Sequence, residues 1–151
     1  MDQKNEIQNE LILAWVRLSG IIKNNRITTT LKYNEAVIML TVYNRYLKDN
    51  VGLTSVQDII KETGMLKSLA NRTLGELEKQ GLITFEQGKT DRRTKFVRLV
   101  KEKLDVFLAV HNSSLGVSKS IVDIIGEDDA DTFIRIVKKL ENAKYKALPN
   151  D

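Results

Sequence analysis

Between residues 52 and 100 the sequence changes from long helical periodicity to short segments separated by glycines, a pattern that few folds accommodate. Five of the chain's eight glycines, Gly52, Gly64, Gly75, Gly81 and Gly88, fall in this segment. Short amphipathic stretches lie between them, and two runs rich in β-branched and aromatic residues follow. Two short helices joined by a glycine-containing turn predict a helix-turn-helix. The two runs predict a β-hairpin directly after it, which is the arrangement of a winged helix.

The limits of the two short helices follow from capping residues. Thr54 or Ser55 can cap the first helix, and Gly64 offers the left-handed residue that ends it. The second helix is expected from about Lys67 to Gln80, with Gly81 directly after it. Its predicted inner face consists of Ala70, Leu74 and Leu77.

The predicted hairpin, with strands at 82–85 and 95–100, is where the chain's excess of positive charge is concentrated. The formal net charge is only +4, but the segments 1–50, 51–103 and 104–151 carry +2, +4 and −2. After a helix-turn-helix, a basic hairpin favours duplex DNA as the partner. The alternative is a hairpin tip whose charges are simply solvated. Residues 87–101 hold six cations against one acid, Asp91: Lys89, Arg92, Arg93, Lys95, Arg98 and Lys101.

Long helical periodicity precedes this segment. Apolar residues recur every three or four positions over 6–23 and 34–48, where Asn34 is the expected N-cap and Gly52 the expected end. The single proline, Pro149, lies near the end of the sequence, so no proline interrupts these helices. The chain is predicted to be mainly α-helical.

Helical periodicity also follows the hairpin. An apolar stripe over 104–125 predicts a helix with a soft point at Ser113–Gly116 and an end at Gly126. A last helix is expected to start at Asp128 or Asp129. The outer helices carry more apolar stripe than a winged helix of about 70 residues can bury. We expect a second subunit to bury the apolar residues of these helices that the winged helix leaves exposed.

The composition excludes several classes of protein. The sequence has no cysteine and one histidine, which excludes disulfides, thiolate zinc sites and thiol nucleophiles. It has no phosphate-binding glycine loop and no metal-ligand cluster, so we expect no enzyme, cofactor or metal. The segment Met1–Glu6 lacks a basic leader before an apolar run, and no stretch approaches the ~18 apolar residues of a membrane span. A cytoplasmic protein without membrane attachment is predicted.

Two motifs resemble the MarR family of bacterial transcription regulators. Residues 64–83 read GMLKSLANRTLGELEKQGLI, and the wing contains Asp91-Arg92-Arg93; the likeness extends from Thr54 to Leu99 and more weakly over nearly the whole chain. The resemblance implies a winged helix-turn-helix flanked by N- and C-terminal dimerisation helices. It implies a homodimeric, sequence-specific regulator, expected to repress from a near-palindromic operator and to be released by a small molecule. The corresponding parts are 1–32 for N-terminal dimerisation, 33–100 for DNA binding and 101–151 for C-terminal dimerisation.

The resemblance also implies which side chains meet DNA. On the recognition helix, Arg suits guanine, Asn suits adenine, and Ser or Lys suits phosphate. One wing arginine is expected in the minor groove, with Arg93 preferred over Arg92. Asp91 is expected to brace the wing by accepting hydrogen bonds from an arginine or from the backbone, rather than to touch DNA, because a carboxylate repels phosphate. The predicted DNA contacts are Lys67, Ser68, Asn71, Arg72, Lys89, Arg92, Arg93 and Lys95.

The sequence departs from the family pattern at the recognition helix. Leu66 stands where a capping Asp or Ser is usual, at a cost of roughly 1 kcal/mol. Gly75 softens the middle of the helix. Leu69 replaces a more polar residue, and core packing is a better interpretation for it than contact with a thymine methyl. These changes affect base specificity more than the fold.

Many relatives bind small aromatic or anionic compounds, and the absence of cysteine excludes thiol-based peroxide sensing. An effector pocket needs aromatic surface with a few polar groups, although such residues are more often ordinary core or interface. An alternative function is a winged-helix module that binds RNA or a protein. The candidate pocket residues are Trp15, Tyr33, Met39, Tyr43, Tyr46 and His111.

Overall fold

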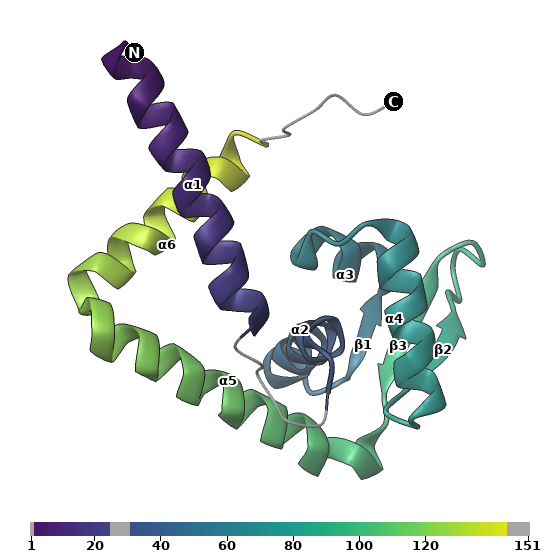
Figure 1. Ribbon diagram of the computed structural model, residues 1–151. Helices are drawn as coiled ribbons and strands as arrows, with labels where there is room; N and C mark the ends of the chain where they lie inside the picture. Colours follow the sequence, from purple (N-terminus) through teal and green to yellow (C-terminus); the bar gives the residue numbers. More distant parts are fainter. Residues whose placement is uncertain (1, 25–30, 145–151) are drawn as a thin grey trace. The chain divides into compact units, whose positions relative to one another are not determined.

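The computed structural model describes residues 2–24 and 31–144, so Pro149 lies outside the described residues. The chain is mainly helical and contains a winged helix with helices before and after it (Figure 1), as the sequence predicts. It divides into two compact units, Met1–Ser113 and Ser114–Asp151. The three-part functional division, with boundaries after residues 32 and 100, stays a prediction.

The order of elements follows the predicted pattern closely. A 3₁₀ turn, Lys101–Lys103, leads from the last strand into the long helix that follows. The helices are α1 (Gln3–Asn24), α2 (Tyr33–Asp49), α3 (Val56–Thr63), α4 (Lys67–Lys79), α5 (Leu104–Ile125) and α6 (Glu127–Asn142), and the strands are β1 (Leu53–Ser55), β2 (Ile83–Gln87) and β3 (Lys95–Leu99).

The sheet of the first unit has one strand more than the sequence patterns predict. Strands β2 and β3 form the expected antiparallel hairpin, in which Phe85 pairs with Val97. Strand β1 pairs antiparallel with the other side of β3, giving the order β1-β3-β2. A three-residue strand is too short to show a period of two, and its partner is distant in sequence. Only the assembled sheet therefore reveals it.

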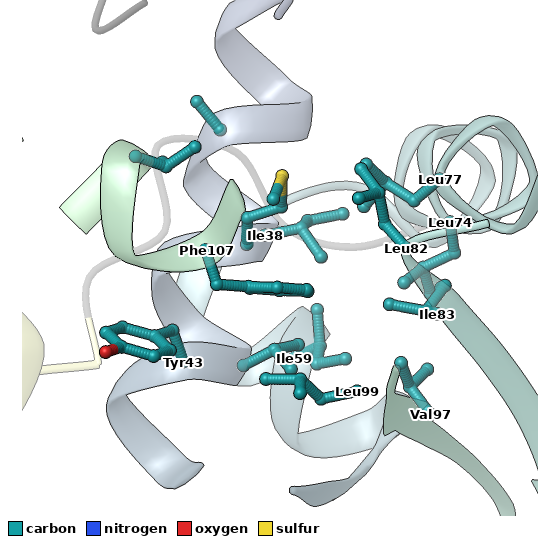
Figure 2. Packing of buried hydrophobic residues seen from close by; sticks show 14 of the residues in the cluster. Ile38, Tyr43, Ile59, Leu74, Leu77, Leu82, Ile83, Val97, Leu99 and Phe107 are labelled. Carbon is teal, nitrogen blue, oxygen red and sulfur yellow. The ribbon is translucent and has the colours of Figure 1, made fainter. Parts of the chain in front are cut away.

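One apolar core joins α2, α3, α4, the start of α5 and the sheet. Ile38, Ile59, Leu74 and Leu77 are fully buried, as the helical spacing requires of an inner face. Figure 2 shows Phe107 of α5 entering this cluster from the side opposite the leucines of α4. The core therefore fastens the helix-turn-helix to the sheet on one side and to α5 on the other.

The first helix of the helix-turn-helix is closed at both ends as the sequence allows. Ser55 caps α3, because its Oγ accepts a hydrogen bond from the Asp58 N–H at 3.0 Å. Thr54, the alternative cap, is instead buried in β1. Gly64 ends α3 in the left-handed conformation, with a φ of 69°.

Helix α2 begins and ends at other residues than expected. Its N-cap is Lys32 rather than Asn34, and the Glu35 carboxylate accepts a hydrogen bond from the Lys32 N–H at 3.3 Å. The Glu35 side chain, within the first turn, thus provides a hydrogen-bond acceptor for a backbone N–H at the helix start. A side-chain cap from Asn34 is therefore not needed. At the other end Asn50, with a φ of 56°, takes the left-handed position predicted for Gly52. Asparagine tolerates that conformation, and Gly52 lies in the turn before β1.

The last two helices differ from the predictions in detail. Helix α5 runs without a break through Ser113–Gly116, although the two compact units meet within it, after Ser113. Helix α6 begins at Glu127, with Gly126 as N-cap, and not at Asp128 or Asp129. Three acidic residues in its first turn interact favourably with the positive end of the helix dipole, which suits an earlier start.

Helices α1, α5 and α6 expose many apolar side chains. Helix α1 has no buried residue, and on α6 Phe133 and Ile134 are each about half exposed. Among the described residues, no helix is both long enough and apolar enough to cross a membrane. The exposed large apolar residues of α1 are Ile7, Leu11, Ile12, Leu13, Trp15, Val16, Ile21 and Ile22, and those of α5 and α6 are Leu108, Leu115, Ile121, Ile124, Ile125, Phe133, Ile134, Ile136, Val137 and Leu140.

Candidate nucleic-acid interface

Helix α4 separates an apolar face from a polar face. Ala70, Leu74 and Leu77 are fully buried, as predicted, and Thr73 joins them with its hydroxyl donating to the Leu69 carbonyl at 2.8 Å. The opposite face is exposed and carries only polar and cationic groups in its first two turns. These exposed residues are Lys67, Ser68, Asn71 and Arg72.

The start of α4 lacks a capping side chain, as predicted. Leu66 is the N-cap residue and offers no hydrogen-bond acceptor to the free N–H groups of the first turn. Met65 before it packs against the core, whereas the Leu66 side chain is 75% exposed. Leu69 is half-buried and lines a hollow with Lys32 and Glu35, and its core-packing role stays a prediction.

The tip of the wing is a tight, hydrogen-bonded turn. The Gly88 N–H donates to the Thr94 carbonyl at 2.7 Å, and the Thr94 N–H donates to the Asp91 carbonyl at 3.1 Å. The Asp91 carboxylate accepts a hydrogen bond from the Arg93 N–H at 3.0 Å. This is the bracing contact with the backbone that the sequence predicts for Asp91, because an Asp side chain readily bonds the N–H two residues on.

The wing cations do not all have the same freedom. Lys89, Arg92 and Arg93 are exposed around the turn. Lys95 is exposed too, but its Nζ lies 3.9 Å from the centroid of the Phe85 ring on the neighbouring strand. A cation–π contact of this kind is worth about 0.5–1 kcal/mol at an exposed site. This contact positions the Lys95 ammonium over the face of the Phe85 ring.

An ion pair across the hairpin was missed by sequence reasoning. The Arg98 guanidinium donates from Nε and Nη2 to the two carboxylate oxygens of Glu86, at 2.7 and 2.8 Å. The hydrogen bond from Arg98 lowers the pKa of Glu86, and the same bond raises the pKa of Arg98. Arg98, which sequence counting places in the positive field of the wing, is therefore neutralised. The only sequence signal for this ion pair is that the two strands of the hairpin carry opposite charges. The register of β2 against β3 is needed to see that Glu86 and Arg98 can pair.

The backbone of the wing turn leaves no room for a side chain at Gly88. A Cβ at this position would overlap the carbonyl oxygen of Asp91, a backbone atom that cannot rotate away. We expect Gly88→Ala to open the turn, to loosen the Asp91 brace and to weaken DNA binding at least severalfold. The measurement is a binding titration combined with backbone NMR shifts of residues 86–95. Gly75→Ala is the matched control, since no atom lies within 4 Å of its added Cβ. Equal effects of the two substitutions would contradict the steric argument.

The structure brings together some of the candidate effector residues. Tyr43 stacks on Tyr46, with ring centroids 6.1 Å apart, and meets the edge of the His111 ring at 5.3 Å. Met39 and Tyr43 belong to the buried core. Tyr33 is half-buried. Trp15 is 59% exposed on α1.

The described part of the chain, residues 2–24 and 31–144, contains no group of three or more His, Cys, Asp or Glu side chains that could hold a metal ion. The exposed face of α4 and the braced wing form the candidate site. A cationic helix face beside a basic hairpin defines a winged helix-turn-helix protein of the nucleic-acid-binding type.

Comparison with known proteins finds a family match for the central part of the chain. The model of the MarR family matches residues 45–94, the segment that carries the helix-turn-helix and most of the wing. Among curated proteins, none matches the sequence. Over this segment the chain is similar to the MarR family of DNA-binding transcriptional regulators.

Solved structures share this fold over nearly the whole chain. One is Sco3205, a MarR family regulator of Streptomyces coelicolor, in complex with DNA. The two structures have a TM-score of 0.74 at 12% sequence identity, and their alignment covers 92% of this chain and 88% of the Sco3205 chain. A mutant MarR of E. coli complexed with operator DNA has a TM-score of 0.68 at 14% identity, covering 93% and 99%. The PcaV regulator of Streptomyces coelicolor, in complex with its natural ligand, has a TM-score of 0.69 at 13% identity, covering 91% and 93%.

Proposed function

We propose that this chain acts as a homodimeric repressor that binds a near-palindromic operator in double-stranded DNA. The observation that carries the proposal is the pairing of an exposed polar and cationic face on α4 with a wing whose turn is held by Asp91. A helix face of this kind fits the major groove, and a basic hairpin fits the adjacent backbone and minor groove. We place the protein in the cytoplasm, with the chromosomal DNA.

Each proposed DNA contact follows from side-chain chemistry. Arg72 and Asn71 can each form paired hydrogen bonds with a base edge, to guanine and adenine respectively. Lys67 and Ser68, at the start of α4, suit phosphate oxygens. In the wing, Lys89 and Arg92 supply phosphate contacts and Arg93 enters the minor groove, while Lys95 contributes from its position over Phe85.

The exposed apolar residues of α1, α5 and α6 support a dimer of this chain. Single exposed leucines are common, but contiguous apolar stripes on three helices expose more than a monomer ordinarily does. A second copy offers the same stripes, so a two-fold interface can bury both sets. Two winged helices related by such an axis match the two half-sites of a palindrome.

A small aromatic or anionic effector is the proposed signal for release. The PcaV structure, which has a related fold, contains its natural ligand. In this chain the contacts among Tyr43, Tyr46 and His111 provide aromatic surface with polar groups. Trp15, Tyr33 and Met39 complete the proposed set, although Met39 reaches a ligand only if the core around it opens.

Duplexes selected from a random pool test the DNA-binding function. We expect enrichment of a near-palindrome, with affinity falling steeply as salt rises, because each neutralised phosphate releases counterions. Arg93→Ala should weaken binding roughly tenfold or more, as loss of a charged hydrogen bond does, and should leave the oligomeric state unchanged in analytical ultracentrifugation. The matched control is Arg135→Ala on α6, where the arginine already pairs with Asp131 at 3.3 Å.

Three outcomes would contradict the proposal. If the protein binds all duplexes equally well, it has no specific operator. If it prefers single strands or RNA, the alternative of an RNA-binding module is favoured. If Arg93→Ala binds DNA with unchanged affinity, the proposed contact of Arg93 with DNA is wrong. A monomer at micromolar concentration would leave the apolar stripes of α1, α5 and α6 without their proposed cover.

A further inference from the structure

Leu66 occupies the start of the recognition helix without contributing to the fold there. Its side chain is 75% exposed, although Met65 before it packs against the core. It stands at the N-cap of α4, where Ser, Thr, Asp and Asn are preferred and leucine is among the worst residues. Helix α3, by contrast, is capped by Ser55. Leu66 therefore supplies neither core packing nor a cap.

The surroundings of Leu66 are polar and exposed. Lys67 and Ser68 follow it directly, and Asn71 and Arg72 lie one turn further along. These neighbours suit phosphates and the nitrogen and oxygen atoms of base edges. Among residues 65–76, Leu66 is the one exposed large apolar side chain, since Met65 and Leu69 are half-buried. The major groove displays one apolar group, the C5 methyl of thymine.

We propose that Leu66 reads a thymine methyl in each half-site and is a specificity-determining residue. This inference rests on the proposed DNA-binding function and deepens it. In helix-turn-helix proteins the N-terminal residues of the recognition helix contact base edges, which is where Leu66 lies. Burial of the methyl against the leucine replaces water on both apolar groups. The poor N-cap is then the cost of placing an apolar side chain at this position.

Deoxyuridine substitution isolates the proposed contact, because it removes only the methyl group. Each thymine of a selected duplex is replaced in turn, and affinity is measured by fluorescence anisotropy for the native chain and for Leu66→Ala. At one thymine per half-site, deoxyuridine should weaken the native chain about fourfold, the amount expected for one buried methyl. Leu66→Ala should lose a similar factor on the thymine duplex and should no longer distinguish thymine from deoxyuridine there. Alanine is as poor an N-cap as leucine, so the helix start is unchanged.

Further variants separate base reading from a structural role. Leu66→Met keeps an apolar side chain and should retain most of the discrimination. Leu66→Ser restores a cap, so it should raise Tm by a few degrees while lowering affinity for the thymine duplex. A structural role would instead move stability and affinity in the same direction. Leu47→Ala removes a similarly exposed leucine, 54% exposed on α2, and should change neither quantity.

The outcomes distinguish this inference from the proposed function. If the native chain binds its duplex but no thymine is sensitive to loss of the methyl, the inference is wrong and DNA binding stands. Equal losses of Leu66→Ala on thymine and deoxyuridine duplexes would also overturn it. If the native chain selects no duplex at all, the proposed function fails, and this inference fails with it.

Discussion

Replacement of Arg72 by alanine is expected to weaken operator binding by about 1–3 kcal/mol per half-site, the amount that a paired contact with one base contributes. The side chain is exposed on α4, one turn from the helix start. The backbone of α4 is held from the other face by Ala70, Leu74 and Leu77, so the loss should come from the contact and not from unfolding. Binding titrations on the selected duplex, with circular dichroism of the variant, measure both quantities.

The effect of Arg72→Ala should be specific to one base pair. On duplexes changed at the position that Arg72 reads, the native chain should lose affinity and the variant should not, because the discriminating hydrogen bonds are already gone. Lys79→Ala is the matched control. Lys79 is a cation on the same helix, in its last turn, where it lies 3.4 Å from Glu76. If both variants lose affinity equally at every base, Arg72 acts only through its charge.

Phe107→Ala is expected to lower the free energy of unfolding by about 3–5 kcal/mol, as other buried aromatic truncations do. Phe107 is fully buried and stacks on Tyr43, with ring centroids 6.3 Å apart. Together with Val110 it comes from α5 and enters a core to which α2, α3, α4 and the sheet also contribute (Figure 2). Its removal should leave a cavity where these elements meet.

Urea unfolding at fixed protein concentration measures the effect of Phe107→Ala, since dimer stability depends on concentration. The control is Leu47→Ala on the exposed side of α2, which should change the free energy of unfolding by less than about 0.5 kcal/mol. Similar losses in both variants would mean that Phe107 does not hold the first unit together.

Features that depend on local spacing were predicted correctly from the sequence. The buried face of α4 follows from residues three and four apart, and its lack of a cap follows from the identity of residue 66. Asp91 braces the wing through an N–H two residues away, so the contact needs no knowledge of the fold. The order of helices and the hairpin follow from the same kind of local signal.

Features that depend on contacts between residues distant in sequence were not predicted from the sequence. The Glu86–Arg98 ion pair and the contact of Lys95 with Phe85 require the register of β2 against β3. Strand β1 exists only because β3 has a free edge to pair with. Some local features were wrong as well: the N-cap of α2 is Lys32 and its C-cap is Asn50, because more than one residue near each end can serve.

The sequence alone determined that this chain contains a helix-turn-helix followed by a basic wing, since periodicity, glycine positions and turn residues act over a few neighbouring residues. The tertiary structure decided which charges of the wing are free, which aromatic residue from α5 completes the core, and that Leu66 is exposed. Burial and cross-strand pairing are properties of surfaces brought together by folding, and no single stretch of sequence contains both sides of such a contact.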